Sequence, residues 1–102
     1  MKIVRVTYTT KAAYAAQNQA NIQKVMADLK KAGHADINYH ACLGPDGKTF
    51  THLAFFQNNE SEKSLFGLPS FSEFQAQLKA SGPEVPPKQE LLTLVASSVD
   101  IF

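Results

Sequence analysis

Two histidines lie on either side of a predicted turn, where a pair of imidazoles could share a proton. His40 belongs to the run INYHACL (37–43) and His52 to TFTHLAFF (49–56), with Gly44-Pro45-Asp46-Gly47 between the runs. Proline presets φ at the first turn position and glycine accepts a positive φ at the third, which favours a β-hairpin with a bulged three-residue loop. Counting back from a Gly44–Lys48 pair places His40 directly opposite His52. A two-residue loop, the alternative, puts His40 opposite Thr51 and on the other face.

The two histidines, if they are paired, could act in acid–base catalysis or bind a ligand. An imidazole titrates near neutral pH, so His52 is a candidate general base or hydrogen-bond donor to a ligand, with His40 as its partner. Two charged imidazoles side by side are unfavourable, so their titrations would be coupled. The plainer interpretation is a half-buried His52 hydrogen-bonded to a neighbour or to a dimer partner, and a partly exposed His40 near the sheet edge. In the bulged register the two histidines share a face with Asn38, Cys42, Phe50, Ala54 and Phe56.

A metal site and a reactive thiol are both poorly supported by the sequence. Zinc sites use three or four protein ligands, and only Cys42 could join the two histidines. Cys42 has no evident cationic neighbour that would lower its thiol pKa, so we expect a small buried residue. We therefore expect no bound metal and no cofactor.

Other residues could hold a ligand. Arg5 lies in a predicted strand, where it could bind a carboxylate or form an ion pair across a dimer, for example with Asp100. Asn38, Phe50, Phe56, Phe71 and Phe74 are candidates to line a pocket for an aromatic molecule. The alternative for each aromatic residue is a place in the hydrophobic core.

Alternation and helical periodicity predict the elements that position these residues. Strands are expected at 2–9, 36–43, 49–57 and 90–101, and helices at 11–32, 60–66 and 71–81. Ile22, Val25, Met26 and Leu29 form a one-sided apolar stripe on the first helix, and Gly33 is expected to end it. The stretch 81–87, SGPEVPP, is expected to be a linker within one domain. The order strand, helix, strand, strand, helix, strand is the ferredoxin-like α+β plan, with a four-stranded antiparallel sheet.

Length, net charge and cysteine content narrow the class of protein to which the chain can belong. The 102 residues suit a single domain, spanning 1–102, and the net charge of +1 gives no sign of a nucleic-acid-binding surface. We expect no membrane association, and the single cysteine fits a cytoplasmic location. The last predicted strand is apolar on both faces, whereas one layer of helices covers only one. We therefore expect a homodimer that buries the second sheet face.

The element order and the segments DGKTFTHL (46–53) and LPSFSEFQ (68–75) resemble the dimeric α+β barrel superfamily, in particular small bacterial proteins near its antibiotic-biosynthesis-monooxygenase-like branch. The resemblance implies a homodimeric barrel with a pocket in each subunit between sheet and helices. The quinone-forming members typically use a Trp and an Asn, but this chain has no Trp and carries Thr7 and Thr9 in its first strand. The haem-degrading members use a helix-borne His, and no His lies in the second helical region.

Two functions remain open at this point. The first is a cofactor-independent enzyme that acts on an aromatic or polyketide-like molecule by monooxygenation or proton transfer. The second is a non-catalytic dimeric module that binds a small apolar or aromatic ligand or has a stress-related role. Opposed histidines on an apolar face favour the first, and the missing Trp favours the second.

Overall fold

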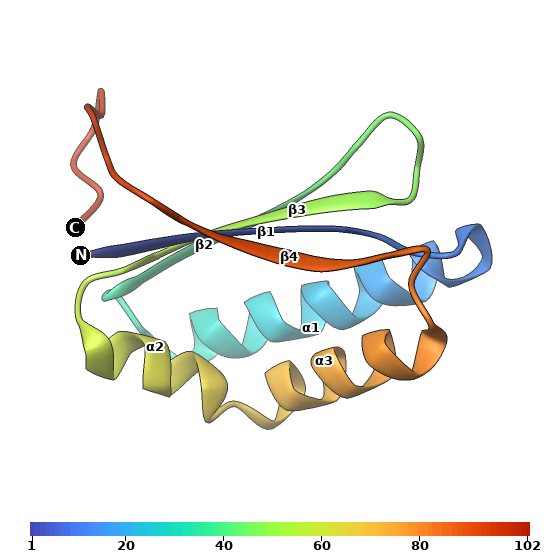
Figure 1. Ribbon diagram of the computed structural model, residues 1–102. Helices are drawn as coiled ribbons and strands as arrows, with labels where there is room; N and C mark the ends of the chain where they lie inside the picture. The colour runs from blue at the N-terminus through green and yellow to red at the C-terminus, as the bar shows by residue number, and fades with distance from the viewer.

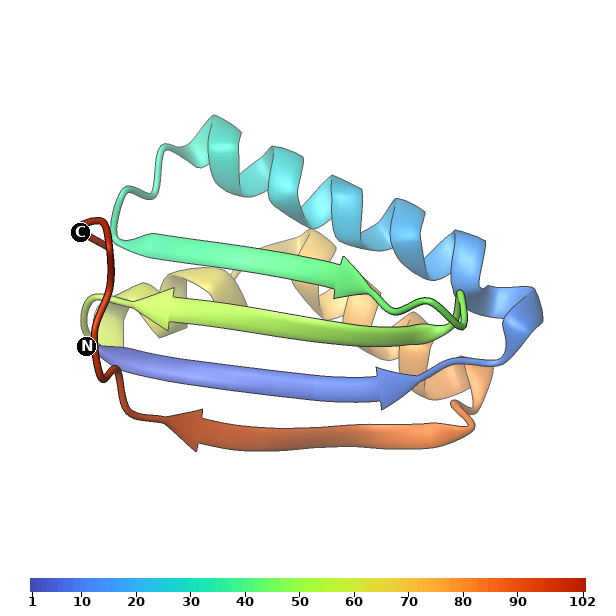
Figure 2. The same cartoon turned by 90° about the horizontal axis from the view of Figure 1, so that it is seen from above.

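The computed structural model describes residues 1–102 as one sheet with helices on a single face (Figure 1). The strands are β1 (Lys2–Thr9), β2 (Ile37–Leu43), β3 (Thr49–Phe56) and β4 (Val85–Leu92). The helices are α1 (Ala15–Ala32), α2 (Asn59–Phe66) and α3 (Pro69–Ser81), with a short 3₁₀ turn, η1 (Ala12–Tyr14), before α1. All strand pairs are antiparallel and the order is β2-β3-β1-β4 (Figure 2). The predicted ferredoxin-like α+β fold is confirmed.

The helices begin and end where local chemistry favours it. Gly33 follows α1 with φ of 70°, a left-handed conformation that glycine adopts without steric cost, as predicted. The Asn58 side chain accepts the Ser61 N–H before α2, in a capping box. Pro69 occupies the first turn of α3, where a missing N–H leaves no hydrogen bond unmade. None of the helices has the length and apolarity needed to cross a lipid bilayer.

The core lies between the helices and the facing side of the sheet. Alternation along β1 and β3 sends every second residue to this side, and α1 contributes an apolar stripe. The apolar side chains buried in this core are Val4, Tyr8, Ala15, Ile22, Val25, Leu29, Phe50, Ala54, Phe56, Leu65, Phe71, Phe74 and Leu78. We call this side of the sheet the helix face and the other side the open face.

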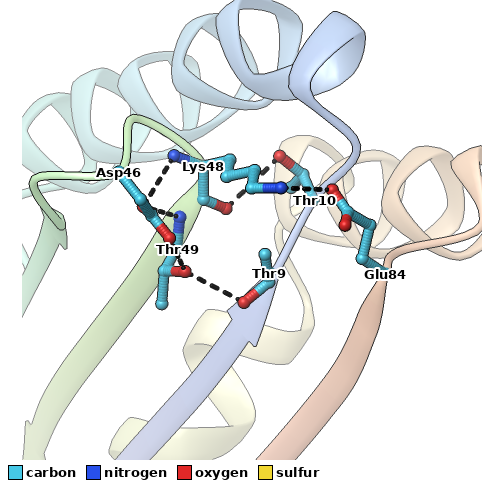
Figure 3. A network of polar contacts seen from close by, with 6 residues as sticks. All are labelled: Thr9, Thr10, Asp46, Lys48, Thr49 and Glu84. Carbon is cyan, nitrogen blue, oxygen red and sulfur yellow. Dashed lines mark hydrogen bonds and ion pairs between the residues drawn. The ribbon is translucent and has the colours of Figure 1, made fainter.

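The β2–β3 hairpin has a longer loop than predicted. The Gly44 N–H donates to the Thr49 carbonyl at 2.8 Å, so Lys48 belongs to the loop. The Lys48 carbonyl instead accepts the Thr10 N–H at 2.9 Å, and the Asp46 carboxylate accepts the N–H groups of Lys48 and Thr49 (Figure 3). These bonds turn the Lys48 backbone toward β1. The turn itself has the expected form, with Gly47 at φ of 77°.

The register of the hairpin therefore contradicts both alternatives drawn from the sequence. His40 pairs with Leu53, and Ala41 pairs with His52. Because a shift of one residue reverses the faces, His40 lies on the open face and His52 on the helix face. Asn38 and Cys42 accompany His40, whereas Tyr39 and Ala41 share the helix face with His52.

The last strand lies earlier in the chain than predicted. β4 includes Val85, Pro86 and Pro87, for which the sequence predicts a linker, and it ends at Leu92. An edge strand tolerates proline because one side of it has no partner that needs an N–H. Residues 93–102 form no regular structure and cross the end of the sheet on the side away from the helices (Figures 1 and 2). Val95 in this segment is 97% exposed.

Candidate functional site

A cavity of about 420 Å³ lies between α3 and the sheet, a volume within the range of small-molecule sites. Its wall is mostly apolar and aromatic, and the α3 side chains Gln75 and Lys79 add polar groups. Its floor includes two tyrosines, Tyr8 from β1 and Tyr39 from β2. The lining residues are Val6, Tyr8, Tyr39, Phe71, Phe74, Gln75, Leu78, Lys79, Pro83, Pro86 and Pro87.

His52 lies next to this cavity and connects its two tyrosines. The side chain is on the helix face of β3, is 5% exposed, and stacks on Phe74 with the ring centroids 5.5 Å apart. The Tyr8 hydroxyl lies 2.8 Å from Nε2 of His52, and the Tyr39 hydroxyl lies 2.6 Å from Nδ1. Both ring nitrogens thus have a phenol as their hydrogen-bond partner.

Asn18 extends the network into α1. Its Nδ2 donates to the Tyr8 hydroxyl at 2.8 Å, and its side chain is fully buried. Its Oδ1 is buried without a partner in the protein. The four side chains Asn18, Tyr8, His52 and Tyr39 form one continuous polar chain, which we call the Asn–Tyr–His–Tyr chain. It begins in the core and ends at the cavity wall.

Burial keeps the three titratable members of this hydrogen-bond network, His52 and the two tyrosines, uncharged at neutral pH. Removal from water lowers the pKa of His52 from its ordinary value of 6.5 to about 4. The same cause raises the pKa of the Tyr8 and Tyr39 hydroxyls far above their usual range, with the Asn18 hydrogen bond lowering that of Tyr8 in part. At pH 7 the imidazole is neutral and both phenols hold their protons. His52 is therefore suited to hold and donate hydrogen bonds, and poorly suited to take up a proton as a base.

The predicted site residues fall into separate groups. Phe71 and Phe74 line the cavity, Phe50 stacks on Tyr8 at a centroid distance of 5.5 Å, and Phe56 is part of the core. The prediction that His40 meets His52 is wrong, because the strand register places them on opposite faces. His40 is exposed on the open face.

Arg5 also lies on the open face, where an ion pair holds it. Its Nη2 lies 2.7 Å from Oε1 of Glu90, the residue that pairs with it across β1 and β4. Asp100 lies beyond β4, which ends at Leu92, and an ion pair of Arg5 with Asp100 across a dimer stays a prediction. The pair also lowers the pKa of Glu90, through the hydrogen bond and the charge of Arg5.

The prediction of a buried Cys42 is wrong, and Asn38 lies close to it. Cys42 is exposed, because its strand is at the edge of the sheet and its side chain is on the open face. Both residues border an open groove of about 1110 Å³ between α1 and β2, which also contains His34 and His40. In the structure no three His, Cys, Asp or Glu side chains come together as metal ligands would.

Asn18, Tyr8 and Tyr39 were not predicted from the sequence to be functional residues. A signal for Asn18 exists: it falls one turn before Ile22 on the buried stripe of α1, where an amide needs a partner. The tyrosines gave no such signal, because aromatic residues on a buried strand face are ordinarily core. Their hydroxyls matter only through the pairing of β1, β2 and β3.

The fold is that of solved antibiotic-biosynthesis-monooxygenase-like proteins. SnoaB, a cofactor-independent oxygenase from Streptomyces nogalater, matches at 14% identity and a TM-score of 0.69, covering 97% of this chain and 98% of its own. Rv0793 from Mycobacterium tuberculosis matches at 11% identity and a TM-score of 0.78, covering 96% and 98%. An antibiotic biosynthesis monooxygenase matches at 10% identity and a TM-score of 0.74, covering 94% and 100%. The sequence matches no protein-family model and no curated protein.

Proposed function

We propose that the protein is a small enzyme that acts, without a resident cofactor, on an aromatic molecule carrying an oxygen substituent. The observation that carries this proposal is the Asn–Tyr–His–Tyr chain, a buried and fully connected polar array that ends at the wall of an otherwise apolar cavity. The cavity beside Phe71, Phe74 and Leu78 has room for a flat aromatic ring, whose oxygen would lie toward the Tyr39 hydroxyl of the floor. The fold shared with a cofactor-independent oxygenase is consistent with this chemistry.

The reaction we propose begins with loss of a proton from a carbon activated by the ring carbonyl. The negative charge moves to the carbonyl oxygen, where hydrogen bonds in a site of low dielectric stabilise it. The proton leaves to water at the mouth of the cavity, since His52 and the two tyrosines stay neutral at pH 7. Oxygenation then consumes dioxygen, the co-substrate: a methylene CH₂ and O₂ give a carbonyl C=O and one H₂O.

Anthrone, a three-ring ketone with an acidic methylene, is a suitable probe. Oxygen uptake and formation of anthraquinone measure oxygenation, and exchange of the methylene protons in deuterated buffer under argon measures proton transfer alone. We expect Tyr39→Phe to lower the faster of these two rates by about 100-fold, the typical effect of removing one donor to an oxyanion. Tyr14→Phe is the control, because Tyr14 is outside the cavity and bonds to Asn21.

Each result of this experiment has a distinct meaning. Oxygen uptake above the buffer rate supports an oxygenase, and proton exchange without uptake supports a proton-transfer enzyme. Equal rates for the wild type, Tyr39→Phe and the buffer contradict both forms of the proposal.

A non-catalytic ligand-binding protein is the second candidate. The neutral state of His52 and both tyrosines favours it, since none of them is a base near neutral pH. Saturable binding of anthrone with no exchange and no oxygen uptake would select this candidate.

We also propose a homodimer that forms through the open face. No helix covers this face (Figure 1), and Leu53, Phe55 and Leu92 lie on it. Exposed apolar residues in the following segment, Val95 and Val99, add surface that a second copy would remove from water.

A further inference from the structure

We infer that Asn18 is a positioning residue: it fixes the direction of the hydrogen bonds along Tyr8 and His52, so that Tyr39 presents its O–H to the cavity as a donor. The ligand this implies is an aromatic molecule with an acceptor oxygen, a ketone or an oxyanion. This ligand class rests on the proposed site, whereas the order of protons along the chain stands independently of any activity.

The orientation of the Asn18 amide is the first step. Its side chain is fully buried, and the Tyr8 hydroxyl is its one hydrogen-bond partner. With Nδ2 donating to Tyr8, the atom left without a partner is the carbonyl oxygen Oδ1. The reversed amide would leave the NH₂ group unpaired instead. A buried N–H without an acceptor is rarer in proteins than an under-satisfied carbonyl, which favours the observed orientation.

The positions of the protons on Tyr8 and His52 follow from the orientation of the Asn18 amide. Because the Tyr8 oxygen accepts from Asn18, its own O–H is free to donate to Nε2 of His52. A neutral imidazole has one N–H and one acceptor nitrogen, so a proton received at Nε2 requires the N–H at Nδ1. Nδ1–H then donates to the Tyr39 oxygen across 2.6 Å.

Tyr39 is the one member of the Asn–Tyr–His–Tyr chain whose O–H donor has no acceptor. Its oxygen accepts from His52, the only hydrogen-bond partner that the structure gives it, and its O–H has no acceptor in the protein. Tyr39 lines the cavity, so a ligand oxygen there would receive this proton. Hydrogen bonds that all run in one direction strengthen one another, which makes Tyr39 a better donor than an isolated phenol.

Nitrogen-15 NMR of the His52 ring tests the order of protons directly. Replacing His34 and His40 with asparagine leaves one imidazole in the spectrum. We expect the wild-type network at pH 7 to show a protonated Nδ1 and an unprotonated Nε2. The opposite tautomer in this protein would overturn the inference, with no need for a further variant.

Asn18→Asp tests the role of Asn18 itself. An aspartate has no N–H to donate and accepts from Tyr8, which reverses every bond along the chain. We expect the proton on His52 to move to Nε2. Asn21→Asp, one turn along the same helix and bonded to Tyr14 and Gln77, is the control that should leave Nδ1 protonated. If Asn18→Asp is unstable, Asn18→Leu removes the donor without adding charge and should yield a mixture of tautomers. An unchanged tautomer in a folded Asn18 variant would overturn the assignment.

Two probes of nearly the same shape test the ligand class. Fluorenone carries a carbonyl acceptor on a flat three-ring frame, and carbazole carries an N–H donor at the equivalent place. We expect the wild type to bind fluorenone about tenfold more tightly than carbazole, the effect of one hydrogen bond, and Asn18→Asp to reverse that preference. Tyr39→Phe should remove the difference. Equal affinities in the wild type, or tighter binding of carbazole, would overturn the ligand class even if anthrone turnover is observed.

Discussion

At the scale of single residues, His52 lies in buried surroundings that favour its neutral form. Its ring lies against Phe74, and both nitrogens are hydrogen-bonded to phenols whose own pKa values are raised by burial. An added proton would carry charge into a region of low dielectric, and no carboxylate is bonded to the ring to balance it. The residue is therefore a fixed part of the network at neutral pH.

This burial predicts a pH dependence of stability. The unfolded chain takes up a proton on His52 below about pH 6.5, whereas the folded chain resists doing so until about pH 4. The unfolded state binds more protons in this window, so the free energy of unfolding falls as the pH drops from 6.5 to 4, by roughly 3 kcal/mol from this group. Urea unfolding at a series of pH values measures the slope.

The contribution of His52 is isolated by comparing variants. In His52→Asn the free energy of unfolding should fall less between pH 6.5 and 4 than in the wild type. The difference should equal the roughly 3 kcal/mol assigned to the His52 imidazole. His40→Asn is the matched control, because that side chain is exposed on the open face. A His52 variant with the wild-type slope would show that the ring is not held neutral.

The histidines also show how much of the candidate site could be predicted from residue types alone. His52 was singled out from the sequence because a histidine amid Phe50 and Phe56 on an alternating strand needs a reason to be there. The structure places it in a buried hydrogen-bond network, and its functional role stays a prediction. Its partners could not be named, since the contact with Tyr8 depends on the β1–β3 pairing and the contact with Tyr39 on the hairpin register. Asn18 comes from a third element, and its role depends on how α1 packs against the sheet.

At the scale of elements, the turn of the β2–β3 hairpin depends on one glycine. Gly47 has φ of 77°, and a Cβ added there would meet nothing within 4 Å. Gly47→Ala would therefore act only through the backbone conformation. We expect this substitution to lower the free energy of unfolding by about 1 kcal/mol. Gly47→Asn should lower it less, because asparagine tolerates the left-handed region. Thermal unfolding of the three proteins measures both effects, and an alanine variant as stable as the wild type would contradict the conformational argument.

The hairpin register and the position of the last strand were predicted wrongly, because both depend on contacts outside those segments. The hairpin register was wrong by one residue because Thr10, distant in the sequence, takes the Lys48 carbonyl that a local turn would use. The last strand was placed too late because Pro86 and Pro87 discourage a strand assignment, yet β4 is an edge strand where prolines are tolerated. By contrast β1 and the end of α1 were predicted correctly, because their alternation, periodicity and stop signal are local. The helix was predicted to begin at residue 11, whereas α1 begins at Ala15, after the 3₁₀ turn η1.

At the scale of the whole molecule, the uncovered sheet face predicts association. We expect the wild type to elute with twice the mass of one chain when size-exclusion chromatography is coupled to light scattering. Leu53→Arg, on the open face, should produce a monomer, because an arginine there would be buried without a partner in the dimer. Ala76→Glu, on the exposed side of α3, is the control and should stay dimeric. A wild type with the mass of one chain would contradict the proposed dimer.

The position of β1 in the sheet has a consequence for how the chain is made. β1 comes first in the sequence but lies between β3 and β4, so its second neighbour is a strand that ends at Leu92. A nascent chain that has reached only α3 has one edge of β1 without hydrogen-bond partners, and such an edge invites pairing with other chains. Contacts between residues this distant in sequence also slow folding. The ribosome-bound protein is thus expected to need protection from aggregation until β4 has been synthesised.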